Sequence, residues 1–287
     1  MEYTNPELPE DINTTKQSAL KELVILTSGL MLIVFAVIYV VILLIDNFAD
    51  KIPFELEKNI PANRFIENLN PQPLPPYLQM LSQQVIANAA LPDEMEIKIH
   101  FVNSDTVNAF ATLGGHIVLY RGLLEKLKYE DEITTIIAHE VAHIKYRHPI
   151  LAASHGLVVA VLLSVISSSI SDSFASNIVN SSGMASLLKF SREFEFQSDK
   201  EAIEILFKVY GHANGALELF KFFKSEASKE SQFEFMATHP LTQNRILHSQ
   251  ELISQKKNIG MTSLRKIPDE FVSWLALQKE KEVKKSN

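Results

Sequence analysis

Residues 131–148, DEITTIIAHEVAHIKYRH, are the most informative part of the chain, because they place His139, Glu140 and His143 in an H-E-x-x-H pattern. On a helix, residues four apart lie on one face, so both imidazoles can reach one Zn²⁺. Glu140 stands beside them and can take a proton from water that the metal activates. The pattern predicts a zinc-dependent hydrolase with Glu140 as the catalytic base. The alternative is a pair of surface histidines on an ordinary amphipathic helix.

The residues before the motif predict the helix that the motif needs. Ile133, Ile136 and Ile137 have the spacing of a core-facing stripe, and Asp131 favours the positive end of the helix dipole. Because proline lacks a backbone donor and clashes with the preceding turn, we expect the helix to end just before Pro149.

A third metal ligand is required, and the sequence narrows the choice. A metzincin would have glycine at position 146 and histidine at position 149, but this chain has Tyr146 and Pro149, which excludes that class. A cluster of acids follows in SREFEFQSDKEAIEIL, residues 191–206, which has a helical pattern.

Helical geometry separates the acids of this segment. At about 100° per residue, Glu195 and Asp199 share the face of Ala202 and Leu206, whereas Glu193 points to the other side. We therefore predict Glu195 as the third ligand and Asp199 as the acceptor that orients a ligand histidine. The alternative is a solvated pair of charges.

Composition excludes several classes of protein. The chain has no cysteine, so a zinc site must use histidines and carboxylates, and neither a disulfide framework nor a thiol nucleophile is expected. A net charge of −7 gives no basic field for a phosphate backbone, so no nucleic acid is expected as a partner. With 46% apolar residues in a length of 287, the chain can bury a sizeable core.

Residues 23–45, LVILTSGLMLIVFAVIYVVILLI, form an uncharged apolar run. A helix of about 23 residues crosses a hydrocarbon core of ~30 Å, so we expect one transmembrane helix in a lipid bilayer. The run is too long for the apolar region of a signal peptide and no cleavage pattern follows it, which predicts an uncleaved anchor. A fully buried soluble helix is the alternative.

The flanking charges predict the orientation of this anchor. Lysines are equally frequent on its two sides, but Lys21 adjoins its start whereas Asp46 adjoins its end, which favours an N-terminus on the inside. We therefore expect a single-pass membrane protein in which the chain after the anchor lies on the outer side of the membrane.

The rest of the chain predicts a tail at 1–22, a proline-rich extended linker at 46–76 and one folded domain at 77–287. The composition of the linker differs from that of its neighbours, because prolines recur along it. We therefore place the start of the folded domain at the end of this proline-rich stretch.

The periodicity of the predicted domain indicates its fold class. Helical spacing at 77–90 is followed by alternating strand patterns at 96–102 and 116–120. Helices then continue to near the C-terminus, two of them begun by Pro240 and Pro268. A small β-sheet embedded in helices predicts the α+β class.

Four segments together resemble, in order, the blocks of the HtpX-like and CAAX prenyl protease family of zinc metallopeptidases. They are NAFATLGGHIVLYRGLL (108–124), DEITTIIAHEVAHIKYRH (131–148), SREFEFQSD (191–199) and THPLTQNR (238–245). The prenyl proteases thread several helices through the membrane, whereas this chain has one clear span. It therefore resembles the single-anchor or periplasmic quality-control members, and CAAX processing is not supported. The resemblance implies a bacterial inner membrane, with the catalytic domain facing the periplasm.

The resemblance implies a mostly helical gluzincin fold with one Zn²⁺ on His139, His143 and Glu195. It also implies that His239 lies near the metal, where it would either steady the oxyanion or cap the site. The alternative for His239 is a histidine at a helix start before Pro240.

The resemblance further implies a substrate-binding region. Asn108, Gly114, Gly115 and His116 would contact the substrate. The strand that follows Gly114 and Gly115 would be the edge on which an extended polypeptide pairs as an added strand.

Residues 150–170, ILAASHGLVVAVLLSVISSSI, are hydrophobic enough for a second span. A single crossing there would separate Glu195 from His139 and His143, so we expect a helix that lies on the membrane or over the active-site cleft. A buried core helix is the alternative.

These observations predict an endopeptidase that cleaves misfolded or unassembled membrane and envelope proteins, the substrates that the resemblance implies. The alternative function is a membrane-tethered chaperone or adaptor that keeps the zinc but rarely cleaves. The presence of Glu140 favours catalysis, because a binding module has no need of a base at that position.

Overall fold

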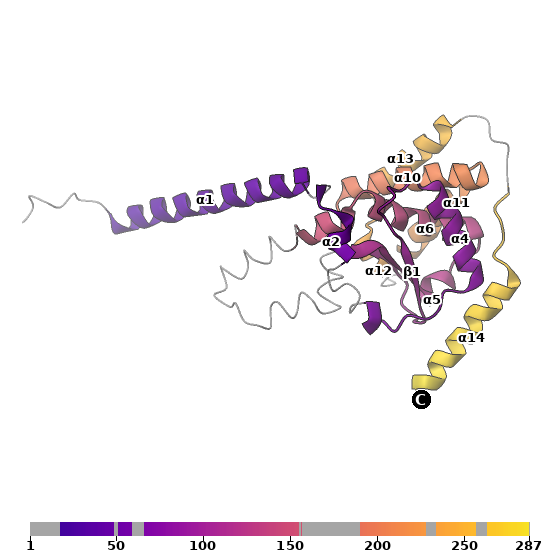
Figure 1. Ribbon diagram of the computed structural model, residues 1–287. Coiled ribbons are helices and arrows are strands. Elements are labelled where there is room, and N and C mark those ends of the chain that lie inside the picture. The colour runs from indigo at the N-terminus through magenta and orange to yellow at the C-terminus, as the bar shows by residue number, and fades with distance from the viewer. Residues whose placement is uncertain are drawn as a thin grey trace, which may run out of the picture. The chain divides into compact units, whose positions relative to one another are not determined.

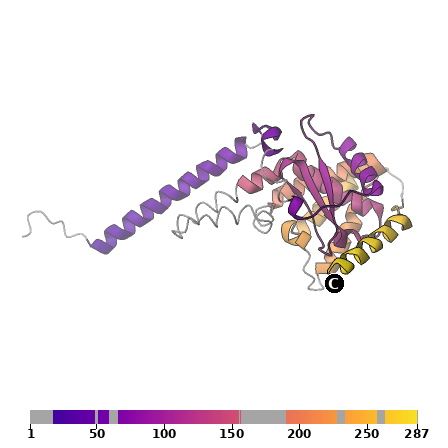
Figure 2. The same cartoon turned by 60° about the horizontal axis from the view of Figure 1, so that its bottom comes forward.

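The computed structural model describes residues 18–48, 51–58, 66–154, 156, 190–227, 234–256 and 263–286. The chain forms two units, residues 1–44 and residues 45–287. Figures 1 and 2 show their helices and strands from two directions.

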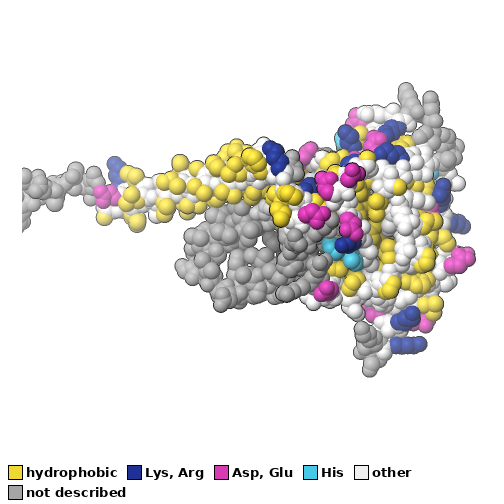
Figure 3. Space-filling view, in the orientation of Figure 1, with side chains coloured by type: hydrophobic (Ala, Val, Ile, Leu, Met, Phe, Trp, Pro, Cys, Tyr) yellow, Lys and Arg dark blue, Asp and Glu magenta, His cyan; other side chains and the backbone are white. Residues whose placement is uncertain are grey.

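Helix α1, Ala19–Phe48, contains the predicted membrane anchor. Its segment Ala19–Ile45 has a mean hydropathy of 3.0, and none of its most apolar window is buried. Figure 3 shows hydrophobic side chains along the visible face of α1; Leu32 and Phe35, for example, are 69% and 67% exposed. Among the described residues, this is the one helix long and apolar enough to cross a membrane.

The second unit combines one sheet with many helices. Its first elements are α2 (Phe54–Lys58), α4 (Pro76–Asn88), β1 (Lys98–Val102), β2 (Ala109–Thr112), the 3₁₀ turn η2 (Leu113–Gly115) and β3 (His116–Tyr120). The helices that follow are α5 (Arg121–Leu124), α6 (Glu130–Lys145), α10 (Arg192–Tyr210), α11 (Asn214–Ala227), α12 (Glu234–Thr238), α13 (Gln243–Gln255) and α14 (Asp269–Ser286). The α+β prediction is confirmed.

The sheet has the strand order β1-β3-β2, with β1 parallel and β2 antiparallel to β3. β3, the strand after Gly114 and Gly115, is therefore the central strand, which corrects the prediction that it forms an edge. The chain reverses at η2, where the two glycines have φ angles of 75° and 81°, and this turn lays β2 along one side of β3. Among the described residues, no strand pairs with the outer side of β2.

Helix α6 covers one face of this sheet. Ala109, Ala111 and Ile117 of the sheet share the main core with Ile133 and Ile137 of α6. Helices α4, α10 and α11 pack around α6 (Figure 1). As a result, every residue of α6 from Glu130 to Ile144 is buried, and the H-E-x-x-H motif lies inside the protein.

The ends of α6 are set by local contacts. The Glu132 carboxylate accepts hydrogen bonds from the backbone N–H groups of Lys128 and Tyr129, at 2.7 and 2.8 Å, and so caps the start. The helix ends at Lys145, a few residues before the predicted stop, because Arg147 adopts a left-handed φ of 61°. A new helical stretch follows at 148–154.

Part of the predicted linker belongs to the second unit, which corrects the expectation of an extended tether through residue 76. In α2, Phe54 is 2% exposed and Glu57 is 4% exposed. Ile66 packs against the sheet face opposite α6, and the backbone N–H of Gln72 donates to the Phe101 carbonyl at 2.8 Å. Prolines predicted an extended chain, but buried partners far away in the sequence order these residues.

Glu57 holds the turn that follows α6. Its Oε1 accepts a hydrogen bond from Arg147 Nε at 2.7 Å, and its Oε2 accepts one from the backbone N–H of Gly114 at 3.3 Å. Arg147 also donates to the Ile52 carbonyl at 2.9 Å. A left-handed conformation costs a non-glycine residue roughly 1–2 kcal/mol, and these contacts offset that cost.

Only the start of the hydrophobic segment 150–170 is described. Ile150 and Ala152 are 7% and 8% exposed. The prediction of a membrane-lying helix otherwise falls outside the described residues.

Candidate metal centre

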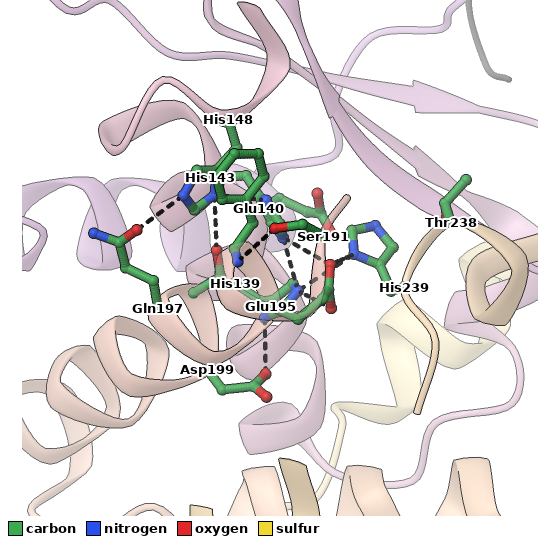
Figure 4. Close-up of polar contacts among 12 residues, drawn as sticks. His139, Glu140, His143, His148, Ser191, Glu195, Gln197, Asp199, Thr238 and His239 are labelled. Atoms are coloured by element: carbon green, nitrogen blue, oxygen red, sulfur yellow. Dashed lines mark hydrogen bonds and ion pairs between the residues drawn. The ribbon is translucent and has the colours of Figure 1, made fainter. Parts of the chain in front are cut away.

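Two helices and one turn bring the candidate donors together. α6 supplies His139 and His143, α10 supplies Glu195, and His239 follows α12 (Figure 4). One donor atom from each of the four lies within 4.8 Å of the other three, and all four side chains are buried. The three donors proposed from the sequence therefore meet at one point, together with His239.

The separations suit a tetrahedral metal. His139 Nε2 lies 3.0 Å from His143 Nε2, and these atoms lie 3.5 and 3.4 Å from the Glu195 carboxylate oxygens. Tetrahedral zinc with bonds of about 2.0–2.1 Å places its ligand atoms about 3.3 Å apart. His239 Nδ1 lies 3.4 Å from His139 Nε2 and 3.0 Å from Glu195 Oε1, where a fourth corner would be.

Unpaired polar atoms at the cluster also fit a cation. Both carboxylate oxygens of Glu140 and Nε2 of His239 are buried without a hydrogen-bond partner among the described residues. Buried polar groups in native proteins are almost always paired, so an orphaned group next to a donor cluster indicates an ion or water there. The residues present therefore fit a bound metal.

Glu140 is placed to act as a base rather than as a ligand. It is fully buried, and its Oε1 lies 3.5 Å from His239 Nε2. Burial raises the pKa of Glu140, while His239 and His139 oppose that increase. The backbone of Ala111, on β2, is a further group that lowers this pKa, so the carboxylate lies between the donor cluster and the outer strand of the sheet.

Asp199 and Arg245 support His139 and Glu195 from behind. Asp199 Oδ1 lies 3.1 Å from His139 Nδ1, the contact that its predicted orienting role requires. Arg245 donates to both Asp199 oxygens at 2.7 Å and forms an ion pair with Glu195. Although burial raises the pKa of Asp199, attraction to Arg245 and hydrogen bonds from Arg245 and His139 hold it below its usual value.

The second ligand candidate, His143, has a different neighbour. Its Nδ1 lies 3.0 Å from Nδ1 of His148, and Nε2 of His148 lies 3.0 Å from Oε1 of Gln197 (Figure 4). His148, beyond the end of α6, and Gln197 of α10 thus support the cluster on the side of His143.

The residues expected to bind substrate are not all at the cluster. Asn108 is 6% exposed and precedes β2, and its Oδ1 has no hydrogen-bond partner among the described residues. Gly114 and Gly115 form the β2–β3 turn; a Cβ on Gly115 would approach the Glu96 carbonyl oxygen to 2.0 Å. His116, on the central strand, pairs with His100 at 2.8 Å between ring nitrogens, a contact that points it at β1.

Several residues with contacts at the site were missed by the sequence reasoning. Arg245 ends the block THPLTQNR, and His148 ends the block DEITTIIAHEVAHIKYRH, so both lay within the segments already singled out. Neither has a spacing that predicts its partner. The signal that could have pointed to Arg245 and His148 was their place in the ordered series of family-like blocks.

Comparison with known proteins identifies a family and several relatives. Residues 74–253 match the sequence model of peptidase family M48. The chain is 26% identical over 225 residues to the mitochondrial metalloendopeptidase OMA1 of Schizosaccharomyces pombe, covering 77% of this chain and 64% of that protein. It is 27% identical over 193 residues to the beta-barrel assembly-enhancing protease of Yersinia pestis, covering 63% of this chain and 39% of that protein.

A third relative has a similar level of sequence identity. The OMA1 protein of Saccharomyces cerevisiae is 28% identical over 167 residues, covering 55% of this chain and 47% of that protein. The chain therefore spans less than two thirds of the length of each of these relatives. The family match is longer than half of the chain and contains His139, His143, Glu195 and His239. It agrees with the family resemblance of the four sequence blocks, and the chain belongs to peptidase family M48.

Proposed function

We propose that this protein is a zinc-dependent endopeptidase tethered to a membrane by α1. The observation that carries the proposal is the donor cluster of His139, His143 and Glu195 with the unpaired Glu140 carboxylate beside it. A bound Zn²⁺ supplies polarisation of the scissile carbonyl and a lower pKa for water. Family membership and relatives named as metalloendopeptidase and protease support a peptide bond as the target.

Each of the side chains at this site has a separate role in hydrolysis. Glu140 takes a proton from the attacking water and later delivers it to the leaving amine. Burial raises its pKa, which makes the carboxylate a better proton acceptor than a solvated one. Asp199 fixes the ring of His139, and Arg245 fixes the carboxylates of Asp199 and Glu195, so the donors need little rearrangement.

We propose that the substrate pairs with the outer side of β2 rather than with β3. The backbone N–H of Tyr120 donates to the Asn108 carbonyl, so alternate residues of β2 bond to β3 and the others, Ala109 and Ala111, direct their N–H and C=O groups outward. Ala111 also lies beside Glu140. An extended polypeptide added on this side would bring a peptide bond to the catalytic base.

We propose that the natural substrates are misfolded or unassembled proteins of the membrane or envelope. A strand-adding site binds extended backbone, which a folded protein rarely offers. The name of the Yersinia pestis relative refers to β-barrel assembly, which is in keeping with an envelope substrate.

The direct test is cleavage of a denatured membrane protein by the full-length protein in detergent. Cleavage should stop on removal of metal with a chelator and return on addition of Zn²⁺. The folded form of the same substrate serves as the matched control and should be cut much more slowly. A metal-loaded protein that binds the denatured substrate without cutting it would instead identify a tethered chaperone or adaptor.

We propose that the catalytic unit faces the periplasm of a bacterial inner membrane. Because the chain has no cysteine, Ser273→Cys on an exposed position of α14 gives a unique thiol. A membrane-impermeant maleimide should label this variant in cells whose outer membrane is permeabilised. Labelling that requires disruption of the inner membrane would place the unit in the cytoplasm.

We propose that His239 caps the site in this structure. Its Nδ1 occupies the fourth corner of the donor cluster, which water or substrate must enter during hydrolysis. His239→Ala is therefore expected to raise the rate of peptide hydrolysis severalfold. A fall in kcat at an unchanged zinc content would assign His239 to stabilisation of the oxyanion instead.

A further inference from the structure

We propose that His148 is a positioning residue that fixes the tautomer of His143 and thereby tightens metal binding. This inference rests on the proposed function, in which His143 is a metal ligand. His148 is 1% exposed, and the proton transfers assigned to Glu140 do not use it.

The two nitrogens of His143 face in different directions. Nε2 faces the donor cluster, 3.0 Å from His139 Nε2 and 3.4 Å from a Glu195 oxygen. Nδ1 faces His148, whose Nδ1 lies 3.0 Å away. A nitrogen that binds a metal must offer its lone pair, so the proton of a neutral His143 belongs on Nδ1.

The proton on His143 Nδ1 determines where the proton of His148 lies in the hydrogen bonds that follow. His143 Nδ1–H donates to His148 Nδ1, which must then be an acceptor, so the proton of His148 lies on Nε2. From there it donates to Gln197 Oε1, at 3.0 Å. The Ser198 hydroxyl, at 3.4 Å from His148 Nδ1, is a weaker contact with the same nitrogen. All hydrogens point away from the metal site, and the lone pair of His143 points toward it.

The fold makes this contact possible by ending α6 early. His148 lies five residues after His143, and on a continuous helix five residues turn by about 500°, which would put the two rings on different faces. The left-handed Arg147 breaks the helix between them, and Glu57 holds Arg147 in place. Phe194 of α10 stacks on His148 at 4.2 Å between ring centres.

The two ligand histidines are thus oriented by unlike partners. His139 has the carboxylate of Asp199, whereas His143 has an uncharged ring. Partners of this kind set the ring orientation of a ligand histidine, and their loss weakens metal affinity by 10–100-fold in other metalloproteins.

The test compares two replacements that separate hydrogen bonding from packing. Asn places its side-chain oxygen near the position of the histidine Nδ1, so His148→Asn keeps an acceptor but loses the ring. His148→Phe keeps a ring that stacks on Phe194 but loses the acceptor. Zinc affinity of the full-length protein, measured by competition with a chromogenic chelator, should fall about 10–100-fold in His148→Phe and stay close to wild type in His148→Asn.

A second buried histidine provides the matched control. His212→Phe makes the same replacement at another buried histidine, outside the donor cluster, and should leave affinity unchanged. Wild-type affinity in His148→Phe, or an equal loss in His148→Asn, would overturn the role of His148. If His143→Ala also bound zinc as tightly as wild type, the proposed metal site itself would fail. The visible spectrum of the Co²⁺-loaded His148→Phe protein should shift, which altered packing away from the ligands would not cause.

Discussion

Glu140→Gln is expected to lower peptide hydrolysis at least about 100-fold, the scale of a lost general base, while the protein retains its zinc. Glu140 is not one of the four clustered donors, so its replacement should leave the metal ligands in place. Glutamine has the same shape and avoids burial of a charge, so folding should not suffer. The measurements are kcat on a denatured protein substrate and zinc content per chain.

The zinc content makes the result decisive for Glu140. If Glu140→Gln were inactive because it contained no zinc, Glu140 would be a metal ligand rather than the catalytic base. Near wild-type turnover in a metal-replete Glu140→Gln protein would refute the mechanism.

Glu195→Gln is expected to weaken zinc binding by about 1000-fold or more, beyond the 10–100-fold loss typical of residues that only orient a ligand. Glutamine removes the negative charge but keeps the side-chain volume. This choice matters because Arg245 is 4% exposed and forms ion pairs with both Glu195 and Asp199. Truncation to alanine would also remove the side-chain oxygen that can accept from Arg245 and leave a cavity, and so would confuse metal loss with unfolding.

Two neighbours on α10 give matched comparisons. Asp199→Asn should lower affinity about 10–100-fold, because Asp199 touches His139 rather than the metal position. Glu193→Gln, on the exposed side of the helix, should bind zinc as wild type does. Equilibrium affinities of the three variants decide the assignment; a zinc-free Glu193→Gln beside a loaded Glu195→Gln would reverse it.

Most of the site residues that could be predicted from the sequence were identified by helical periodicity. His139 and His143 lie one turn apart, and rotation about a helix turns Glu195 and Asp199 inward and Glu193 outward. The structure places Glu195 at 1% and Asp199 at 4% exposure, with Glu193 exposed. Such predictions need only local geometry, since the core selects one face of each helix.

Features that depend on contacts between segments far apart in the chain could not be predicted from the sequence. Strand order requires knowledge of which segments pair, and the parallel pairing of β1 with β3 makes β3 central. Similarly, Glu57 is ordered by Arg147, ninety residues later in the chain. The left-handed conformation of Arg147, which brings His148 to His143, has no sequence signature, because non-glycine residues rarely adopt it.

The spacing of the donors along the chain has a consequence for biosynthesis. His139 and His239 are separated by 100 residues, and Glu195 precedes His239 by 44. Because a domain generally folds as a unit while the ribosome extends it from the N-terminus, a nascent chain that ends before Glu195 presents only two of the donors. Arg245, which holds Glu195 and Asp199, emerges later still. The complete donor cluster therefore cannot assemble until the chain has been synthesised through His239, and we expect the site to be inactive before that point.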